Sequence, residues 1–134
     1  MFDYKGFIDG ILKQDPARIR ACFAEDAVVN WHCTNERFTV EEYIRANCEY
    51  PGKWDGEIEA VHQAGDLYVV VTKVYPADRS ASFHCVSFLR CRDGKIASLD
   101  EYWADDGEPP KWRQEMKIGR AITQGGIHRK QMPD

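Results

Sequence analysis

The chain has 134 residues, with 22 Asp and Glu against 18 Lys and Arg, and its formal net charge is -4. This length fits one domain that can bury a substantial core. The acidic balance, without any long run of like charges, argues against nucleic acid or an anionic membrane as a partner. The first residues lack the basic and apolar regions of a signal peptide, and no stretch is long enough to span a membrane. We therefore expect a cytoplasmic protein.

The chain has five cysteines, an odd number, and no two of them are separated by the two-residue gap typical of zinc or redox motifs. A disulfide framework is therefore not expected. The cysteines are interpreted as small buried hydrophobes in a reducing compartment, and a catalytic thiol is the minor alternative.

Two helices are predicted at the start of the chain. Apolar residues from Tyr4 to Leu12 recur at three- and four-residue spacing, which is typical of an amphipathic helix, and this helix should end near Gln14. Asp15 and Pro16 then form an N-cap and a first helical position, so they begin a short second helix. Both apolar stripes require a sheet to cover.

A strand and a third helix follow. Residues 27–31 have the β-branched and aromatic composition of a strand. Thr39 and Glu42 have the spacing of a capping box, which predicts the start of a helix there, and Pro51 with Gly52 should end it.

From residue 57 onward the pattern becomes β, with turn signals between four predicted strands at 57–63, 67–75, 82–92 and 95–104. Consecutive turn-linked strands indicate an antiparallel meander. Helices at the front and strands at the back indicate an α+β domain over residues 1–134, with the helices on one face of a curved sheet. Residues 105–134 form a tail that should lie across the domain, and its last residues should be mobile.

The last predicted strand contains the main candidate for chemistry. It follows a tight Asp93-Gly94 turn and alternates between two faces. One face is predicted to hold Ala97, Leu99, Glu101 and Trp103, and the other Ile96, Ser98, Asp100 and Tyr102. A carboxylate between Leu and Trp loses solvation, which raises its pKa toward the range useful for proton transfer. Glu101 is therefore a candidate general acid or base.

This order of elements resembles the nuclear transport factor two-like superfamily, and within it the SnoaL-like group. The likeness rests on the Phe-Ala-Glu-Asp-Ala-Val segment at 23–28, the Asp93-Gly94-Lys95-Ile96 turn and the Glu101-Tyr102-Trp103 strand end, and it covers about residues 3–104. It implies a cone-shaped barrel with three N-terminal helices on a mainly antiparallel sheet and a cavity between them. Members include polyketide cyclases, ketosteroid isomerases, dehydratases, epoxide hydrolases and non-catalytic modules, so the fold does not specify an activity.

The resemblance also implies which residues face inward. In epoxide-hydrolase-like members the catalytic acid stands five residues after the isoleucine of Gly-Lys-Ile, which here is Glu101. The same register predicts a pocket lined by Val29, Trp31, Tyr68, Val70, Thr72, Phe83, Cys85, Ser87, Leu99 and Trp103. Asn30, His32, His84 and Asp100 should face outward.

The chain departs from the family at the central strand. Epoxide hydrolases of this fold need an arginine and a second acid there, but the inward positions here are close to Val70, Thr72 and Val74. That mechanism is therefore not expected. A paired acid or His/Asp set, which isomerase or dehydratase chemistry would prefer, cannot be placed in the cavity either.

Two alternatives to a catalytic Glu101 stay open. If the register slips by one residue, His84 and Asp100 face inward and become the catalytic pair. Glu101 could also be a structural rim residue bonded to the backbone or to Arg113. No metal-ligand cluster and no phosphate-binding glycine loop is evident, so neither metal nor cofactor is expected.

The sequence therefore favours a SnoaL-like protein that holds a small apolar or aromatic molecule. Isomerisation, cyclisation or dehydration by proton transfer from Glu101 would be its chemistry, with Thr72 and Ser87 as orienting donors. The competing hypothesis is a non-catalytic ligand-binding or dimerisation module. Apolar residues on the outward face, Val69, Val71 and Tyr75, favour a homodimer through the sheet.

Overall fold

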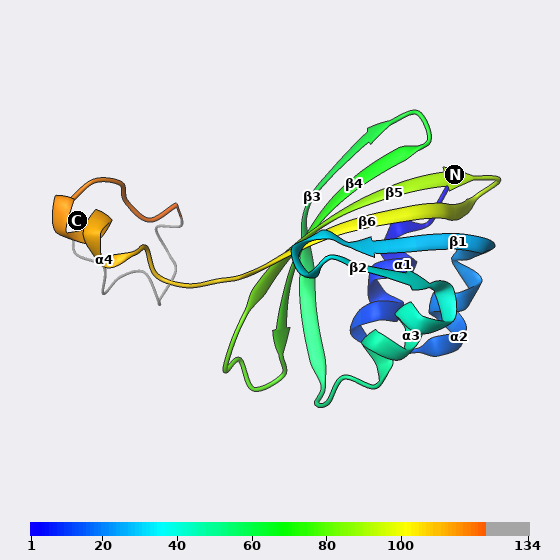
Figure 1. Cartoon of the computed structure of the whole chain (residues 1–134), viewed down its shortest axis with the longest axis horizontal. Helices are drawn as coiled ribbons and strands as arrows, with labels where there is room; N and C mark the ends of the chain where they lie inside the picture. Colours follow the sequence, from blue (N-terminus) through cyan, green and yellow to red (C-terminus); the bar gives the residue numbers. More distant parts are fainter. Residues whose placement is uncertain (123–134) are drawn as a thin grey trace.

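A computed structural model describes residues 1–122 as one six-stranded sheet with three helices against one face (Figure 1). The strand order is β2-β1-β6-β5-β4-β3. The strands are β1 (Phe23–Trp31), β2 (Glu36–Thr39), β3 (Trp54–Ala64), β4 (Leu67–Pro76), β5 (Phe83–Arg92) and β6 (Lys95–Asp105). The helices are α1 (Tyr4–Leu12), α2 (Pro16–Ala21), α3 (Val40–Cys48) and α4 (Lys111–Met116), with a 3-10 turn η1 (His32–Thr34). The predicted α+β class is confirmed, although the sheet is open, with β2 and β3 at its edges.

The helix starts follow the predicted caps. Asp15 accepts a hydrogen bond from the backbone of Arg18, and Pro16 begins α2. At α3, the Thr39 hydroxyl accepts from the backbone N–H of Glu42, whose carboxylate accepts from the backbone N–H of Thr39. This reciprocal pair is the predicted capping box.

The first helix is shorter than predicted because Gln14 has a positive φ of 53° and cannot continue it. The Gln14 amide instead donates to the backbone carbonyls of Asn47 and Tyr50, each at 2.9 Å. This contact joins the end of α1 to the end of α3.

The β1 region differs from the prediction in two ways. β1 begins at Phe23, four residues early, because Phe23 pairs with Ile96 of β6. Asn35 then takes a left-handed conformation, with φ 56°, and turns the chain into β2, which the sequence did not predict. β2 pairs antiparallel with β1, whereas β1 runs parallel to β6.

The predicted antiparallel meander is confirmed for β3 to β6. Its register, together with the parallel β1–β6 pair, aligns residues of four strands in one row across the sheet: Trp31, Glu101, Ser87 and Val70. The next row holds Val29, Leu99, Leu89 and Tyr68, all of them buried. The buried face of the sheet packs on α1 and α3, where Phe7 and Tyr43 are almost fully covered.

A bulge corrects the predicted faces at the start of β6. The register of β5 against β6 shifts between Arg90 and Cys91. Ile96 therefore enters the core with no exposed surface, although strict alternation puts it on the opposite face from Leu99. Ala97 is correspondingly only half-buried.

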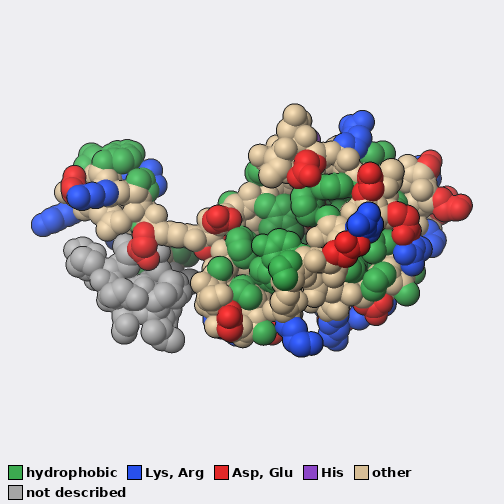
Figure 2. Space-filling view, turned by 60° about the horizontal axis from the view of Figure 1, so that its bottom comes forward, with side chains coloured by type: hydrophobic (Ala, Val, Ile, Leu, Met, Phe, Trp, Pro, Cys, Tyr) green, Lys and Arg blue, Asp and Glu red, His purple; other side chains and the backbone are tan. Residues whose placement is uncertain are grey.

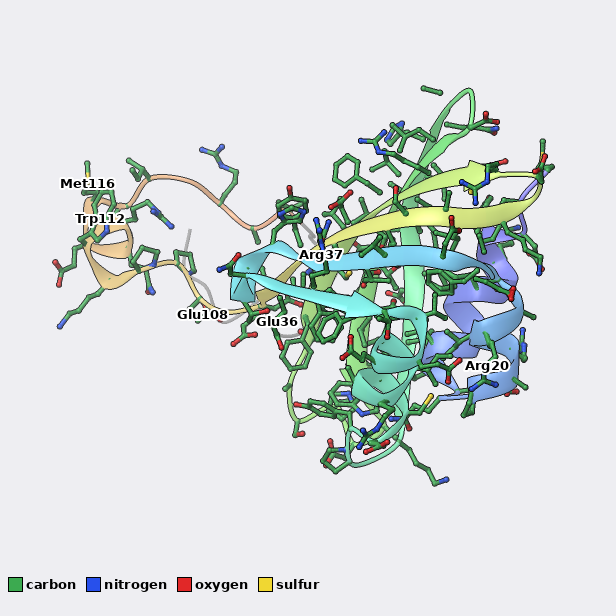
Figure 3. The ribbon with its side chains drawn as sticks, turned by 45° about the vertical axis from the view of Figure 1, so that its right-hand side comes forward. Arg20, Glu36, Arg37, Glu108, Trp112 and Met116 are labelled. Carbon is green, nitrogen blue, oxygen red and sulfur yellow. The ribbon has the colours of Figure 1, made fainter. Side chains whose placement is uncertain are left out.

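The tail was predicted to lie across the domain, but its described part does not. Figure 1 shows α4 set apart from the sheet at the end of an extended segment, and Figure 3 shows Trp112 and Met116 on this helix, away from the strands. Both of these side chains are 58% exposed. The last residues of the tail, which were predicted to be mobile, lie outside the described residues.

The core position of Leu99 yields a stability prediction. Leu99 is fully buried between Val29 and Leu89, so Leu99→Ala should lower the free energy of unfolding by about 2–5 kcal/mol in urea titrations. Ile118→Ala, at a 54% exposed position, is the control and should change it by less than about 0.5 kcal/mol. Equal losses in both variants would contradict this assignment of the core.

Candidate active site and its pocket

Glu101 lies on β6 with 3% of its surface exposed and is held by three hydrogen-bond donors. Its Oε1 atom accepts from the Trp31 indole N–H at 3.0 Å and from the Tyr43 hydroxyl at 3.1 Å. Its Oε2 atom bonds the Ser87 hydroxyl at 2.6 Å. These donors come from β1, α3 and β5, so the carboxyl group joins the helical layer to three strands of the sheet.

Burial dominates the electrostatics of this group. Loss of solvation raises the pKa of Glu101 above its ordinary value, and the hydrogen bonds from Ser87, Trp31 and Tyr43 lower it by a smaller amount. Burial and the nearby Glu101 charge also raise the pKa of Tyr43 and of the Cys85 thiol. Tyr43 therefore stays protonated and acts as a donor, and Cys85 is not a reactive thiolate.

A pocket of about 300 Å³ opens beside this group at the end of the cone. Its aromatic walls are Trp31, Tyr50, Trp54, Phe83 and Trp103. Aliphatic side chains of Ile11, Leu12, Ala46 and Val74 complete them, with polar groups from Gln14, Cys33, Thr34 and Asn47 and one carboxylate, that of Asp105. Figure 2 brings forward the lower end of the domain in Figure 1 and shows hydrophobic side chains gathered there, with Asp and Glu side chains around them.

The structure divides the predicted pocket residues into two layers. Trp31, Phe83 and Trp103 line the pocket. Beneath them lies a buried layer that does not line it: Val29, Tyr68, Val70, Thr72, Cys85, Ser87 and Leu99. Glu101 belongs to this lower layer and is connected to the pocket wall through its hydrogen bond from Trp31.

Two polar atoms near this layer have no hydrogen-bond partner within residues 1–122. These are the Thr72 hydroxyl oxygen and the Trp103 indole nitrogen, both buried. Such groups are rare in proteins because an unpaired buried donor costs free energy. The Trp103 donor belongs to a residue of the pocket wall.

His84 and Asp100, the alternative catalytic pair, are not brought together. In the register of β5 against β6, His84 lies opposite Ala104 and Asp100 lies opposite Phe88. Asp100 instead contacts Asn30 at 3.0 Å and His32 at 2.7 Å, whereas His84 lies between Asp106 and Glu59. Both clusters lie on the outward face, where these four predicted outward residues had been placed.

The alternative in which Glu101 is a rim residue bonded to the backbone or to Arg113 does not fit the structure. The carboxyl group is not at a rim, and its hydrogen-bond partners are side chains rather than backbone. Arg113 lies on α4, which Figure 1 shows apart from the sheet. Glu101 is therefore a buried residue whose carboxyl group is bonded by side chains of three other elements.

Four residues of the site, Tyr43, Tyr50, Trp54 and Asp105, were not predicted from the sequence. Trp54 and Tyr50 lie near the junction of α3 and β3, where no periodicity indicates a direction. Asp105 had a signal, because it lies two residues beyond Trp103 on an alternating strand. Tyr43, the donor from α3, was missed because its partner is 58 residues away.

Neither a metal-binding cluster nor a membrane-spanning helix is found within residues 1–122. No three His, Cys, Asp or Glu side chains among residues 1–122 form a group that could hold a metal ion. No helix of that part is both long and apolar enough to cross a membrane.

Solved structures share this architecture. A "putative ketosteroid isomerase" from Kribbella flavida is 25% identical, with a TM-score of 0.75 over 90% of this chain and 88% of its own. An NTF-2 like protein of unknown function from Burkholderia xenovorans is 18% identical, with a TM-score of 0.71 over 88% of this chain and 91% of its own. A hypothetical protein with a ketosteroid isomerase-like fold from Catenulispora acidiphila, solved in complex with trimethylamine, is 17% identical, with a TM-score of 0.62 over 74% of this chain and 82% of its own.

The helices on one face of a curved sheet, with a pocket at the open end, define a nuclear transport factor two-like α+β cone. No curated protein matches the chain. The family described as the SnoaL-like domain matches residues 4–99, and the chain belongs to that family.

Burial of Glu101 predicts a pH dependence of stability. Because the pKa of Glu101 is raised in the folded state, the folded protein binds more protons than the unfolded one between the ordinary carboxyl pKa and the raised value. Stability is present below this window and should be lost as pH rises through it. Wild type should therefore lose about 1.4 kcal/mol relative to Glu101→Gln for each pH unit by which the pKa is raised.

Urea unfolding of both proteins from about pH 4 to about pH 8 measures this difference. Glu25→Gln, at an exposed position of β1, is the matched control and should track wild type at every pH. If wild type instead gained stability over Glu101→Gln with rising pH, the folded-state pKa would be lowered and the assignment would be wrong.

Proposed function

We propose that this protein binds a small organic molecule in the pocket at the open end of the cone. The observation that carries the proposal is the pocket itself, which is walled by five aromatic side chains and has a volume of about 300 Å³. Apolar concave sites with a few polar groups are the usual form of small-molecule sites. This volume is at the small end of the range for such sites, so the ligand should be small.

Glu101 supports this function by positioning the wall. Its carboxyl group fixes the Trp31 indole through a 3.0 Å hydrogen bond, and Trp31 packs against Trp103 with ring centroids 6.2 Å apart. Since Trp31 has one indole N–H, this bond selects one orientation of the ring. The wall is therefore preorganised for a ligand, which lowers the ordering cost of binding.

Filling the pocket should weaken binding. Ala46 lies on α3 and lines the pocket, so Ala46→Phe should place a ring in the cavity and weaken binding of small aromatic compounds by at least about tenfold. Ala17→Phe, on the exposed face of α2, is the matched control and should bind as wild type does.

Ligand-induced shifts of the tryptophan indole signals in nuclear magnetic resonance spectra measure the binding. Trp31, Trp54 and Trp103 should shift on addition of a panel of phenols, indoles and cyclic ketones, whereas exposed Trp112 should not. If no compound shifts the three pocket signals, the binding proposal fails.

Proton transfer by Glu101 is the second candidate function. The raised pKa of Glu101 and its hydrogen bond from the pocket residue Trp31 favour it, as does the likeness to the Kribbella flavida protein named as a "putative ketosteroid isomerase". Isomerisation, cyclisation and dehydration all need a proton moved at carbon. The carboxyl group would have to reach the ligand by displacement of Trp31, because it does not line the pocket in this conformation.

Hydrogen exchange at a carbon acid tests the second candidate. Wild type should accelerate deuterium incorporation from heavy water into the α-carbons of cyclohexanone, and Glu101→Gln should abolish the acceleration while it keeps the Trp54 shift on ketone binding. Equal exchange rates for wild type and Glu101→Gln would leave Glu101 with its positioning role and contradict the catalytic one.

We also propose that two copies associate through the outward face of the sheet. Val69 lies opposite Phe88, and Val71 lies opposite Val86, so apolar side chains form a strip across β4 and β5. Tyr102 of β6 extends the strip and is 43% exposed. Tyr75, which was predicted to belong to it, is instead covered by the Arg79 guanidinium 4.1 Å from its ring.

Tyr102→Glu should dissociate this dimer, because it places a charge in the apolar strip. Sedimentation velocity should give a dimer for wild type and a monomer for the variant. Ile118→Glu, at an exposed site beyond α4, is the control and should remain dimeric. If only Ile118→Glu dissociates, the C-terminal arm rather than the sheet is the interface.

A further inference from the structure

The aromatic side chains of the pocket form two groups of neighbouring rings. Trp31 and Trp103 belong to the ends of β1 and β6, and their ring planes meet at 69°. Trp54 packs between Tyr50 and Phe83, with ring centroids 5.3 Å and 5.8 Å from its own. The five pocket rings therefore come from β1, β3, β5, β6 and the loop that follows α3.

Aromatic faces carry a negative electrostatic potential, and tryptophan binds cations most strongly among the aromatic residues. Three of the five rings are tryptophans. The Trp31 indole N–H also donates to the Glu101 carboxyl group. When that carboxyl is ionised, this hydrogen bond polarises the indole and makes its ring face more negative. The walls are thus suited to a positive group.

The charge of the pocket also favours a positively charged ligand. Of the described residues that line it, Asp105 alone carries a charged side chain at neutral pH, and Lys and Arg are absent from that set. Asp105 lies opposite Phe83 in the β5–β6 register, so its carboxylate belongs to the same end of the sheet as the rings. Residues 1–110 hold 20 Asp and Glu against 12 Lys and Arg, a formal charge of -8, which attracts cations to the domain.

We propose that the pocket is an aromatic cage for a small organic cation, a methylated ammonium group that packs against the rings of Trp31, Trp54 and Trp103 with Asp105 as its counter-ion. This inference names the ligand class of the site and rests on the proposed binding function. A compact methylated ammonium group suits the pocket because its methyl groups bury apolar surface while its charge meets the ring faces.

A matched ligand pair tests the proposal. Choline and 3,3-dimethylbutan-1-ol have the same shape and hydroxyl group, but only choline is charged. Isothermal titration calorimetry of the full chain should give choline at least about tenfold the affinity of the neutral alcohol. Equal affinities, or a preference for the alcohol, would overturn the cation proposal and leave the binding function intact.

Two variants locate the interaction. Asp105→Asn should weaken choline about threefold to tenfold and leave the neutral alcohol unchanged, because it removes charge and keeps shape. Trp54→Leu should weaken choline more than the alcohol, since it removes one ring face. Trp112→Leu, on the exposed α4, is the control and should leave both affinities at the wild-type value.

The two levels of proposal fail differently. If choline fails to bind but the neutral alcohol or a phenol does, the pocket binds small molecules and the cation preference is wrong. If neither choline nor any neutral compound of the panel binds, both the binding function and this inference are wrong. If choline binds but Asp105→Asn and Trp54→Leu keep wild-type affinity, the cation lies elsewhere and the cage is refuted.

Discussion

The carboxyl group of Glu101 accepts hydrogen bonds from a tryptophan of β1, a tyrosine of α3 and a serine of β5, and it lies itself on β6. A buried carboxyl group is costly unless its oxygens are satisfied, so all three donors must keep their positions for the core to form around it. The helical layer and the sheet are thereby held in one relative arrangement. The pocket is subject to this constraint through Trp31, which is both a donor to Glu101 and a wall of the cavity.

The site combines a buried polar group, Glu101 with its hydrogen-bond donors, and an apolar pocket. Trp31 belongs to both, because it lines the pocket and donates to Glu101. One fold can support several chemistries because function depends on the residues of the site rather than on the fold. In this chain the upper layer is aromatic with one carboxylate, and the lower layer holds Glu101 with Tyr43, Cys85 and Ser87. The fold is shared with the family, whereas the residues of these two layers are specific to this chain.

The sequence could predict those parts of the fold that depend on local rules. The capping box at Thr39, the turn at Asp93 and the two-residue period of β4 and β5 have a meaning within a few residues, and each was confirmed. Ile96 pairs with Phe23, which is distant in the sequence, so no local pattern indicates its burial. The short strand β2 was missed although its partner β1 is close in the sequence, and the position of α4, apart from the sheet, was also missed. The pocket residues Tyr50 and Trp54 were missed because they lie where no periodicity indicates a direction, whereas the inward face of β6 from Leu99 to Trp103 followed from its alternation.

The parallel pairing of β1 with β6 has a consequence for how the protein folds during synthesis. The hydrogen bond between Trp31 and Glu101 closes a loop of 70 residues, and such distant pairings slow folding because chain entropy is lost before the contact is made. During synthesis the first three helices and the β1–β2 hairpin leave the ribosome before the strand that completes their sheet exists. The chamber is therefore assembled late, and until β6 arrives the indole of Trp31 and the hydroxyl of Tyr43 lack the acceptor that fixes them in the finished protein.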